Sequence, residues 1–193
     1  MEYPRLPDFE CRDVRDLEGG MSMVWHCTPA EGSLLLWNAR CGQGGVSTVS
    51  AMGIEGALAP HDVNPMLGPL EKVLEEVRAA QFRDKPPRKG ALYAFEDEAT
   101  CRKYAAKWFG HRRTEIVRLE ILSGSIVHRG HLGWLSNPRK EEWPEVARSY
   151  WAGEEADPPH DWEYVIFGSV FCPDWNGPPF GRPPFAKVTG SNP

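Results

Sequence analysis

Three side chains with chemical potential lie in short apolar segments typical of β-strands. His26 lies in VWHCT, Tyr93 in KGALYAF and Glu163 in WEYVIF. A carboxylate fixed on a strand can stabilise the positive charge of an oxocarbenium-like transition state, through which glycosidic bonds break. Tyrosine supplies an aromatic surface for stacking, and histidine a hydrogen bond that fixes the pose of a ligand. The three residue types therefore suit glycosidic-bond chemistry, provided that the fold brings them together.

The elements that must position these side chains follow from hydrophobic periodicity. A helix is expected over 69–81, where Leu70, Val73, Leu74 and Val77 recur at the spacing of one helical face. The other expected elements are helices at 96–109 and 141–151, strands at 21–27, 91–95 and 114–122, a sheet extension at 125–128, a strand or short helix at 33–39, a long loop at 41–69, and at 162–172 either a strand pair or one strand bent at Gly168.

Short strands scattered among about three helices indicate an α+β fold rather than a doubly wound sheet. The sequence contains no GxGxxG after a strand and no GxxxxGK[ST], which excludes Rossmann and P-loop nucleotide sites. We expect a tail over 1–20 and a single domain over 21–190, with a proline-rich end that frays.

The composition is that of an ordinary globular protein, with 41% hydrophobic residues, a net charge of −5 and 193 residues. An acidic balance argues against a nucleic-acid coat or a membrane-surface protein, since both need a basic face. Arg112 and Arg113 beside His111, or Arg139 with Lys140, could form a local basic patch, although a solvated face is the simpler interpretation.

Cysteine usage and hydropathy bear on the compartment. The five cysteines include no CxxC pair, which argues against a zinc ribbon or a thioredoxin-like site and favours reduced thiols in a cytoplasmic protein. The polar N-terminus does not resemble a signal peptide, and no apolar run approaches the ~18 residues of a membrane span. The histidines of the HRGH run, His128 and His131, lack a third metal ligand nearby, so we expect no metal.

The three strand-like segments resemble the poly(ADP-ribose) polymerase branch of the ADP-ribosyltransferase superfamily, which uses a His-Tyr-Glu triad. The sequence WHCT is similar to the family's first motif, KGALYA to its second with one residue added, and EYVIF to its third. A second resemblance, over 74–95 and 150–168, is to an uncharacterised bacterial family with the same transferase-like layout. The resemblance implies a split β-sheet core of the ADP-ribosyltransferase type and NAD as the substrate.

The resemblance also implies a role for each residue of the triad. Glu163 would bind a ribose hydroxyl and orient the acceptor, Tyr93 would stack on the nicotinamide ring, and His26 would bond the adenosine-side ribose. Simpler interpretations remain open: Glu163 as a water-facing edge residue, Tyr93 as plain core and His26 as a half-buried structural histidine.

Further NAD contacts follow from the same resemblance. Thr28 matches the Ser or Thr of the first motif, Tyr104 the family's second tyrosine, and Cys101 the serine that bonds the nicotinamide amide. Arg88 is a candidate for an NAD phosphate, because arginine suits anion binding, with a solvated loop arginine as the alternative. The sequence departs from the family at Cys27, where the family has glycine, at Cys101, and in a long His-to-Tyr interval that makes 41–69 and the helix over 69–81 insertions.

These observations predict a bacterial, toxin- or effector-like mono-ADP-ribosyltransferase that acts in the cytoplasm or, as a secreted effector, in a target cytosol. We expect a monomer whose acceptor is a protein or a nucleic acid, and no membrane partner. Two alternatives stay open: a catalytically weak binding module of the same fold, and an NAD glycohydrolase in which water replaces the acceptor.

Overall fold

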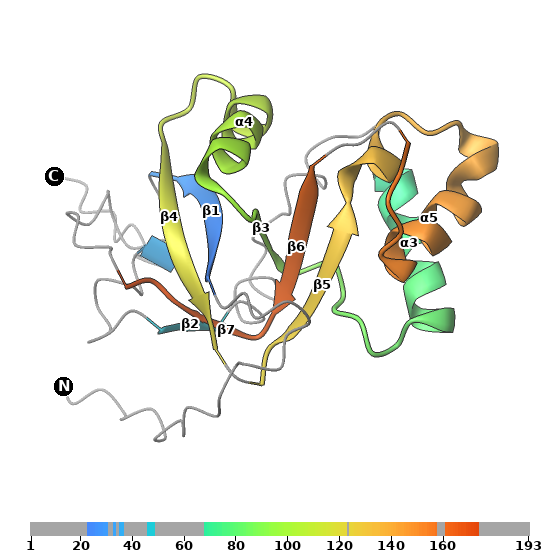
Figure 1. Ribbon diagram of the computed structural model, residues 1–193, viewed down its shortest axis with the longest axis horizontal. Coiled ribbons are helices and arrows are strands. Elements are labelled where there is room, and N and C mark those ends of the chain that lie inside the picture. Colours follow the sequence, from blue (N-terminus) through green and yellow to red (C-terminus); the bar gives the residue numbers. More distant parts are fainter. Residues whose placement is uncertain are drawn as a thin grey trace, which may run out of the picture.

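The computed structural model describes residues 23–30, 33, 35–36, 46–48, 68–122, 124–157 and 161–173. Over these residues the fold is α+β, with two antiparallel sheets and three helices of ten residues or more (Figure 1). The predicted tail over 1–20, most of the predicted loop over 41–69 and the far end of the predicted domain lie outside the described residues.

The first sheet has four strands in the order β1-β4-β7-β2. These are β1 (Met23–Pro29), β4 (Thr114–Ile121), β7 (Ser169–Phe171) and β2 (Val46–Thr48). Strand β2 corrects the prediction of a continuous loop over 41–69. It pairs with β7, which is more than 120 residues away in sequence, and such a remote partner leaves no trace in local hydrophobic periodicity.

The second sheet has three strands in the order β3-β6-β5. These are β3 (Leu92–Ala94), β6 (Trp162–Phe167) and β5 (Ile126–His131). The segment predicted over 162–172 as a strand pair or a bent strand is a pair, but its members belong to different sheets. They are separated by Gly168, whose φ of 150° suits glycine and whose added Cβ would lie 2.5 Å from the Ser125 hydroxyl oxygen.

The three predicted helices are confirmed, with shifted ends. They are α3 (Gly68–Gln81), α4 (Glu98–Phe109) and α5 (Trp143–Ala152). Helix α4 begins later than predicted because the Asp97 side chain caps it, accepting a hydrogen bond of 2.8 Å from the backbone N–H of Thr100. Two short 3-10 helices precede α5: η2 (Leu132–Leu135) and η3 (Lys140–Glu142). Within the segment predicted as strand or short helix, Leu35 and Leu36 are helical.

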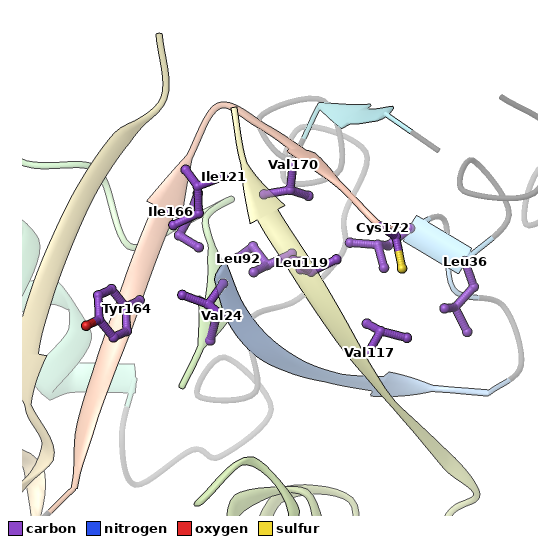
Figure 2. Close-up of a cluster of buried hydrophobic side chains, with 12 residues drawn as sticks. Val24, Leu36, Leu92, Val117, Leu119, Ile121, Tyr164, Ile166, Val170 and Cys172 are labelled. Atoms are coloured by element: carbon purple, nitrogen blue, oxygen red, sulfur yellow. The ribbon is translucent and has the colours of Figure 1, made fainter. Parts of the chain in front are cut away.

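The buried side chains form three hydrophobic clusters. One cluster fills the space between the two sheets and takes residues from both (Figure 2). On the outer face of the second sheet, α3 and α5 lie side by side, whereas α4 covers β1 of the first sheet (Figure 1). Full burial of an aliphatic side chain contributes about 1.5–3 kcal/mol to folding stability, so these clusters hold the strands in position. The inter-sheet cluster consists of Val24, Leu35, Leu36, Leu92, Ala94, Val117, Leu119, Ile121, Tyr164, Ile166, Val170 and Cys172.

None of the helices in the described ranges is both long enough and apolar enough to span a lipid bilayer.

Candidate functional site

The strands that carry the predicted triad are neighbours. Strands β1 and β3 meet at a bridge between Trp25 and Phe95, whose backbones exchange hydrogen bonds of 2.8 and 2.7 Å. Strand β3 in turn lies beside β6 (Figure 1). The two strands pair with Tyr93 opposite Val165. The bridge and the ladder therefore place the segments that bear His26, Tyr93 and Glu163 on three adjacent strands, although up to 137 positions separate them in sequence.

His26 contacts the backbone of Tyr93. Its Nδ1–H donates a hydrogen bond of 2.7 Å to the Tyr93 carbonyl oxygen. Burial lowers the pKa of His26 to about 4, and this hydrogen bond offsets only part of that shift. His26 is therefore neutral near pH 7 and links β1 to β3 in that form.

Glu163 is fully buried, with an exposed fraction of 0%. Its Oε1 accepts a hydrogen bond of 2.6 Å from Arg88 Nη1 and one of 2.7 Å from the Tyr150 hydroxyl. The simple interpretation of Glu163 as a water-facing edge residue is therefore wrong. A buried carboxylate needs such donors, because an uncompensated charge in the interior is costly.

Arg88 stands at the centre of this network. Its Nε and Nη2 donate to the two carboxylate oxygens of Glu71 over 2.8 and 3.0 Å, while its Nη1 reaches Glu163 and, over 2.5 Å, the Tyr150 oxygen. The guanidinium carbon lies 5.0 Å from the ring centroids of both Tyr93 and Tyr150. With 2% exposure, Arg88 is not the solvated loop arginine that was one alternative.

Electrostatics keeps Arg88 charged despite its burial. Burial by itself lowers the pKa of Arg88, but the carboxylates of Glu163 and Glu71 raise it further than burial lowers it, so the pKa lies well above its ordinary value. One buried cation thus faces two carboxylates, the fully buried Glu163 and the partly exposed Glu71. We call Arg88, Glu71, Tyr150 and Glu163 the Arg88 network.

Tyr150 enters the network because Gly130 leaves room for its ring. Gly130 pairs with Glu163 between β5 and β6, and a Cβ at Gly130 would lie 2.3 Å from Cε2 of Tyr150. Burial raises the pKa of the Tyr150 hydroxyl well above its usual range, and Glu163 adds to the rise while Arg88 opposes it. The hydroxyl therefore keeps its proton and donates a hydrogen bond to the Glu163 carboxylate.

The two tyrosines predicted to enclose nicotinamide belong to different clusters of buried side chains. Tyr93 is 3% exposed, and its hydroxyl donates a 2.8 Å hydrogen bond to the carbonyl of Arg88. The Tyr104 ring stacks on Phe95 with centroids 4.9 Å apart. The pKa of the Tyr104 hydroxyl is raised first by burial, then by the carboxylate of Asp161, with which the hydroxyl shares a hydrogen bond, and then by Glu163. Tyr104 thus approaches the start of β6 from α4.

Thr28 and Cys101, two predicted NAD contacts, have hydrogen-bond partners outside the Arg88 network. The Thr28 hydroxyl donates a 2.9 Å hydrogen bond to the Ser33 oxygen. Cys101 is 0% exposed, and its thiol shares a hydrogen bond with Cys27, which together with burial raises the pKa of Cys101. Thr28 is hydrogen-bonded to Ser33 and Cys101 to Cys27, so the structure does not bring either side chain into the Arg88 network.

Sequence reasoning missed Tyr150 and Glu71 as members of the site. Tyr150 belongs to the apolar stripe of α5, a pattern that predicts a core residue, and it does lie in the core. Glu71 lies in the first turn of α3, where an acidic residue commonly stabilises the helix by interacting with the positive end of its dipole. The available signal was Gly130, because a glycine inside a strand often marks the close approach of another group.

The histidines of the HRGH run form hydrogen bonds with the backbone. His128 Nε2–H donates to the Tyr150 carbonyl over 3.0 Å, and His131 Nδ1 accepts from the N–H of Ala156 over 3.1 Å. Within the part of the chain that the structure describes, no group of three or more His, Cys, Asp or Glu side chains is placed to hold a metal ion.

Comparison with known proteins yields one family. Residues 67–172, more than half of the 193-residue chain, match a family described as "Protein of unknown function (DUF2441)". A search of the curated proteins finds no match. The matched range includes the whole of the Arg88 network but begins after β1 and His26.

Proposed function

The chain belongs to the DUF2441 family, and we propose that it is an NAD-dependent mono-ADP-ribosyltransferase with an ADP-ribosyltransferase-like split-sheet core. The observation that carries the proposal is the adjacency of β1, β3 and β6, which bear His26, Tyr93 and Glu163 in the chain order of the His-Tyr-Glu triad. Because no short-range pattern forces three remote segments onto neighbouring strands, their adjacency supports the resemblance seen in the sequence.

The proposed chemistry depends on the carboxylate of Glu163. Cleavage of the nicotinamide–ribose bond develops positive charge on the ribose, and a preorganised carboxylate stabilises that charge mainly in the transition state. The Arg88 network supplies this preorganisation, since Arg88 and the Tyr150 hydroxyl hold Oε1 from two directions. His26 and Tyr93 are the proposed contacts to NAD.

Access to Glu163 requires part of its surroundings to move. Its exposed fraction is 0%, and Tyr93 is 3% exposed, so neither side chain meets a ligand at the surface as the chain stands. The proposal therefore includes an opening step that precedes NAD binding, as is common for sites that exclude water during reaction.

The acceptor, the biological setting and the assembly belong to the same proposal. We propose a monomeric, toxin- or effector-like bacterial enzyme that acts in the cytoplasm on a protein or nucleic-acid acceptor. The acidic net charge of −5 favours a protein acceptor slightly, because nucleic acid is bound best by a basic surface.

A second candidate is a binding module of the same fold without catalytic activity. It is favoured by the burial of Glu163 and by its ion pair with Arg88, both of which also suit a purely structural carboxylate. Cys101, in place of the serine that bonds nicotinamide in the resembling family, is a poorer donor and supports the same candidate.

Nicotinamide release from NAD by the purified protein, with and without bacterial lysate, tests the proposal. The matched pair of variants is Glu163→Gln, which keeps the shape of the buried side chain, and Glu141→Gln, which makes the same change at an exposed site. Release that needs both lysate and Glu163 supports the transferase, and release without lysate supports the glycohydrolase. If the wild-type protein binds NAD in calorimetry but releases no nicotinamide, the binding module replaces the enzyme.

A further inference from the structure

Two donors from different parts of the fold form hydrogen bonds to the same oxygen of Glu163. Arg88 Nη1 and the Tyr150 hydroxyl both bond Oε1, at 2.6 and 2.7 Å, and Arg88 also bonds the Tyr150 oxygen at 2.5 Å. The three groups therefore form a closed triangle. A carboxylate held at one oxygen in this way has a defined rotation, which a single hydrogen bond would not give it.

The triangle is anchored beyond the site. Glu71 of α3 holds the far side of the Arg88 guanidinium in a bidentate pair, and burial against β5 holds the Tyr150 ring where Gly130 has no side chain. Because the guanidinium is planar, its bond to Glu71 also sets the direction in which Nη1 points. The orientation of Glu163 is thus determined by α3, α5 and β5 together.

From this geometry we infer that Tyr150 is a positioning residue for Glu163 in the proposed reaction, acting together with Arg88. Tyr150 fixes the rotation of the Glu163 carboxylate and, as a donor, favours its ionised form. The inference rests on the proposed function, because positioning has a kinetic meaning only if Glu163 acts on NAD.

The titratable and charged groups that face Glu163 determine how the proposed activity depends on pH. They are Arg88 from the loop before β3, Tyr150 of α5, Tyr93 of β3, Tyr104 of α4 and His128 of β5, with Glu71 of α3 acting through Arg88. Among them, Tyr150 is a direct donor to the carboxylate that carries no charge. Its removal makes protonation of Glu163 easier without altering the charge of the surroundings. The Tyr150→Phe variant makes that change.

Steady-state nicotinamide release tests the inference, with kcat, KM and the pH profile measured for wild type and Tyr150→Phe. We expect kcat to fall about 10- to 100-fold, the equivalent of one hydrogen bond to a charged group, while KM for NAD changes little. The acidic limb of the kcat profile should move to higher pH, because the ionised carboxylate has lost a donor. A purely structural role for the hydroxyl would not move that limb.

The matched control is Tyr164→Phe, which removes a hydroxyl from the adjacent strand residue on the opposite face of β6, in the cluster between the sheets (Figure 2). It should leave kcat and the pH profile unchanged. Gly130→Ala provides an independent route, since its Cβ would displace the Tyr150 ring while Arg88, Tyr150 and Glu163 all keep their side chains. Folded Gly130→Ala protein should show the same loss of kcat.

The outcomes separate the inference from the proposed function. Wild-type activity with an unchanged kcat and pH profile in Tyr150→Phe overturns the inference and leaves the enzyme standing, as does a loss that appears in KM alone. Absence of nicotinamide release by the wild-type protein overturns both.

Discussion

Arg88 and Glu163 form a buried ion pair, with 2.6 Å between Nη1 and Oε1, across 75 positions of the sequence. The pair joins the loop before β3 to the start of β6, and Glu71 extends the connection to α3. Since both partners are almost fully buried, the pair ties the outer helices to the second sheet as well as preparing the proposed site.

Replacing Arg88 by methionine should destabilise the protein strongly. The side chain keeps its bulk, but Glu163 and Glu71 lose their cation in the interior, and breaking a buried pair in this way costs about 3–5 kcal/mol. The measurement is the free energy of unfolding in urea. Arg102→Met is the control, because Arg102 pairs with Glu98 on the surface of α4, with side-chain exposures of 64% and 41%. Its loss should be at most about 0.5 kcal/mol, and equal losses for the two variants would contradict a special role for Arg88.

Gly130→Ala should destabilise the fold by about 1–3 kcal/mol through overpacking. The added Cβ meets ring atoms of Tyr150 at 2.3 and 2.4 Å, so α5 or the ring must shift. Thermal unfolding measures the effect. Gly68→Ala is the matched control, since a Cβ at that position meets nothing within 4 Å, and we expect it to be neutral or slightly stabilising.

Acid should destabilise the protein through two histidines, His128, which is buried, and His26, which is half-buried. Burial lowers the pKa of both His26 and His128 to about 4, against an unfolded value of 6.5. Between these values the unfolded chain binds more protons than the folded protein, so this contribution is complete above about pH 6.5 and is lost as the pH falls toward 4.

Urea unfolding at about pH 7 and about pH 4.5 measures this loss. The comparison is with His128→Gln, which keeps a side-chain donor for the Tyr150 carbonyl but does not titrate. The variant should lose less stability than the wild type between the two pH values. An identical pH dependence would show that His128 titrates normally in the folded state.

Cys27 and Cys101 should resist thiol reagents until the protein unfolds. Their exposed fractions are 2% and 0%, and the two free thiols share a hydrogen bond between β1 and α4. Labelling by a maleimide, mapped by mass spectrometry, should be slow in buffer and complete in denaturing urea. Rapid labelling of Cys101 in buffer would mean that α4 opens readily from β1.

The sequence predicted the main elements well and their pairing poorly. The periodicity of Leu70, Leu74 and their neighbours placed α3 to within one residue, because a helical face is written in local spacing. By contrast, β2 was missed, and β5 was predicted as an extension of the preceding strand's sheet although it pairs with β6. Strand pairing depends on partners far along the chain, which no window of a dozen residues contains.

By itself the sequence determined the α+β composition, the three main helices and the segments that carry His26, Tyr93 and Glu163. Only the tertiary structure decided that Glu163 is buried, that Arg88 faces two carboxylates rather than solvent, and that Tyr150 joins them through the space left at Gly130. The physical reason is that local propensity follows from neighbouring residues, whereas burial and the pairing of charges depend on which remote segments fill the same volume.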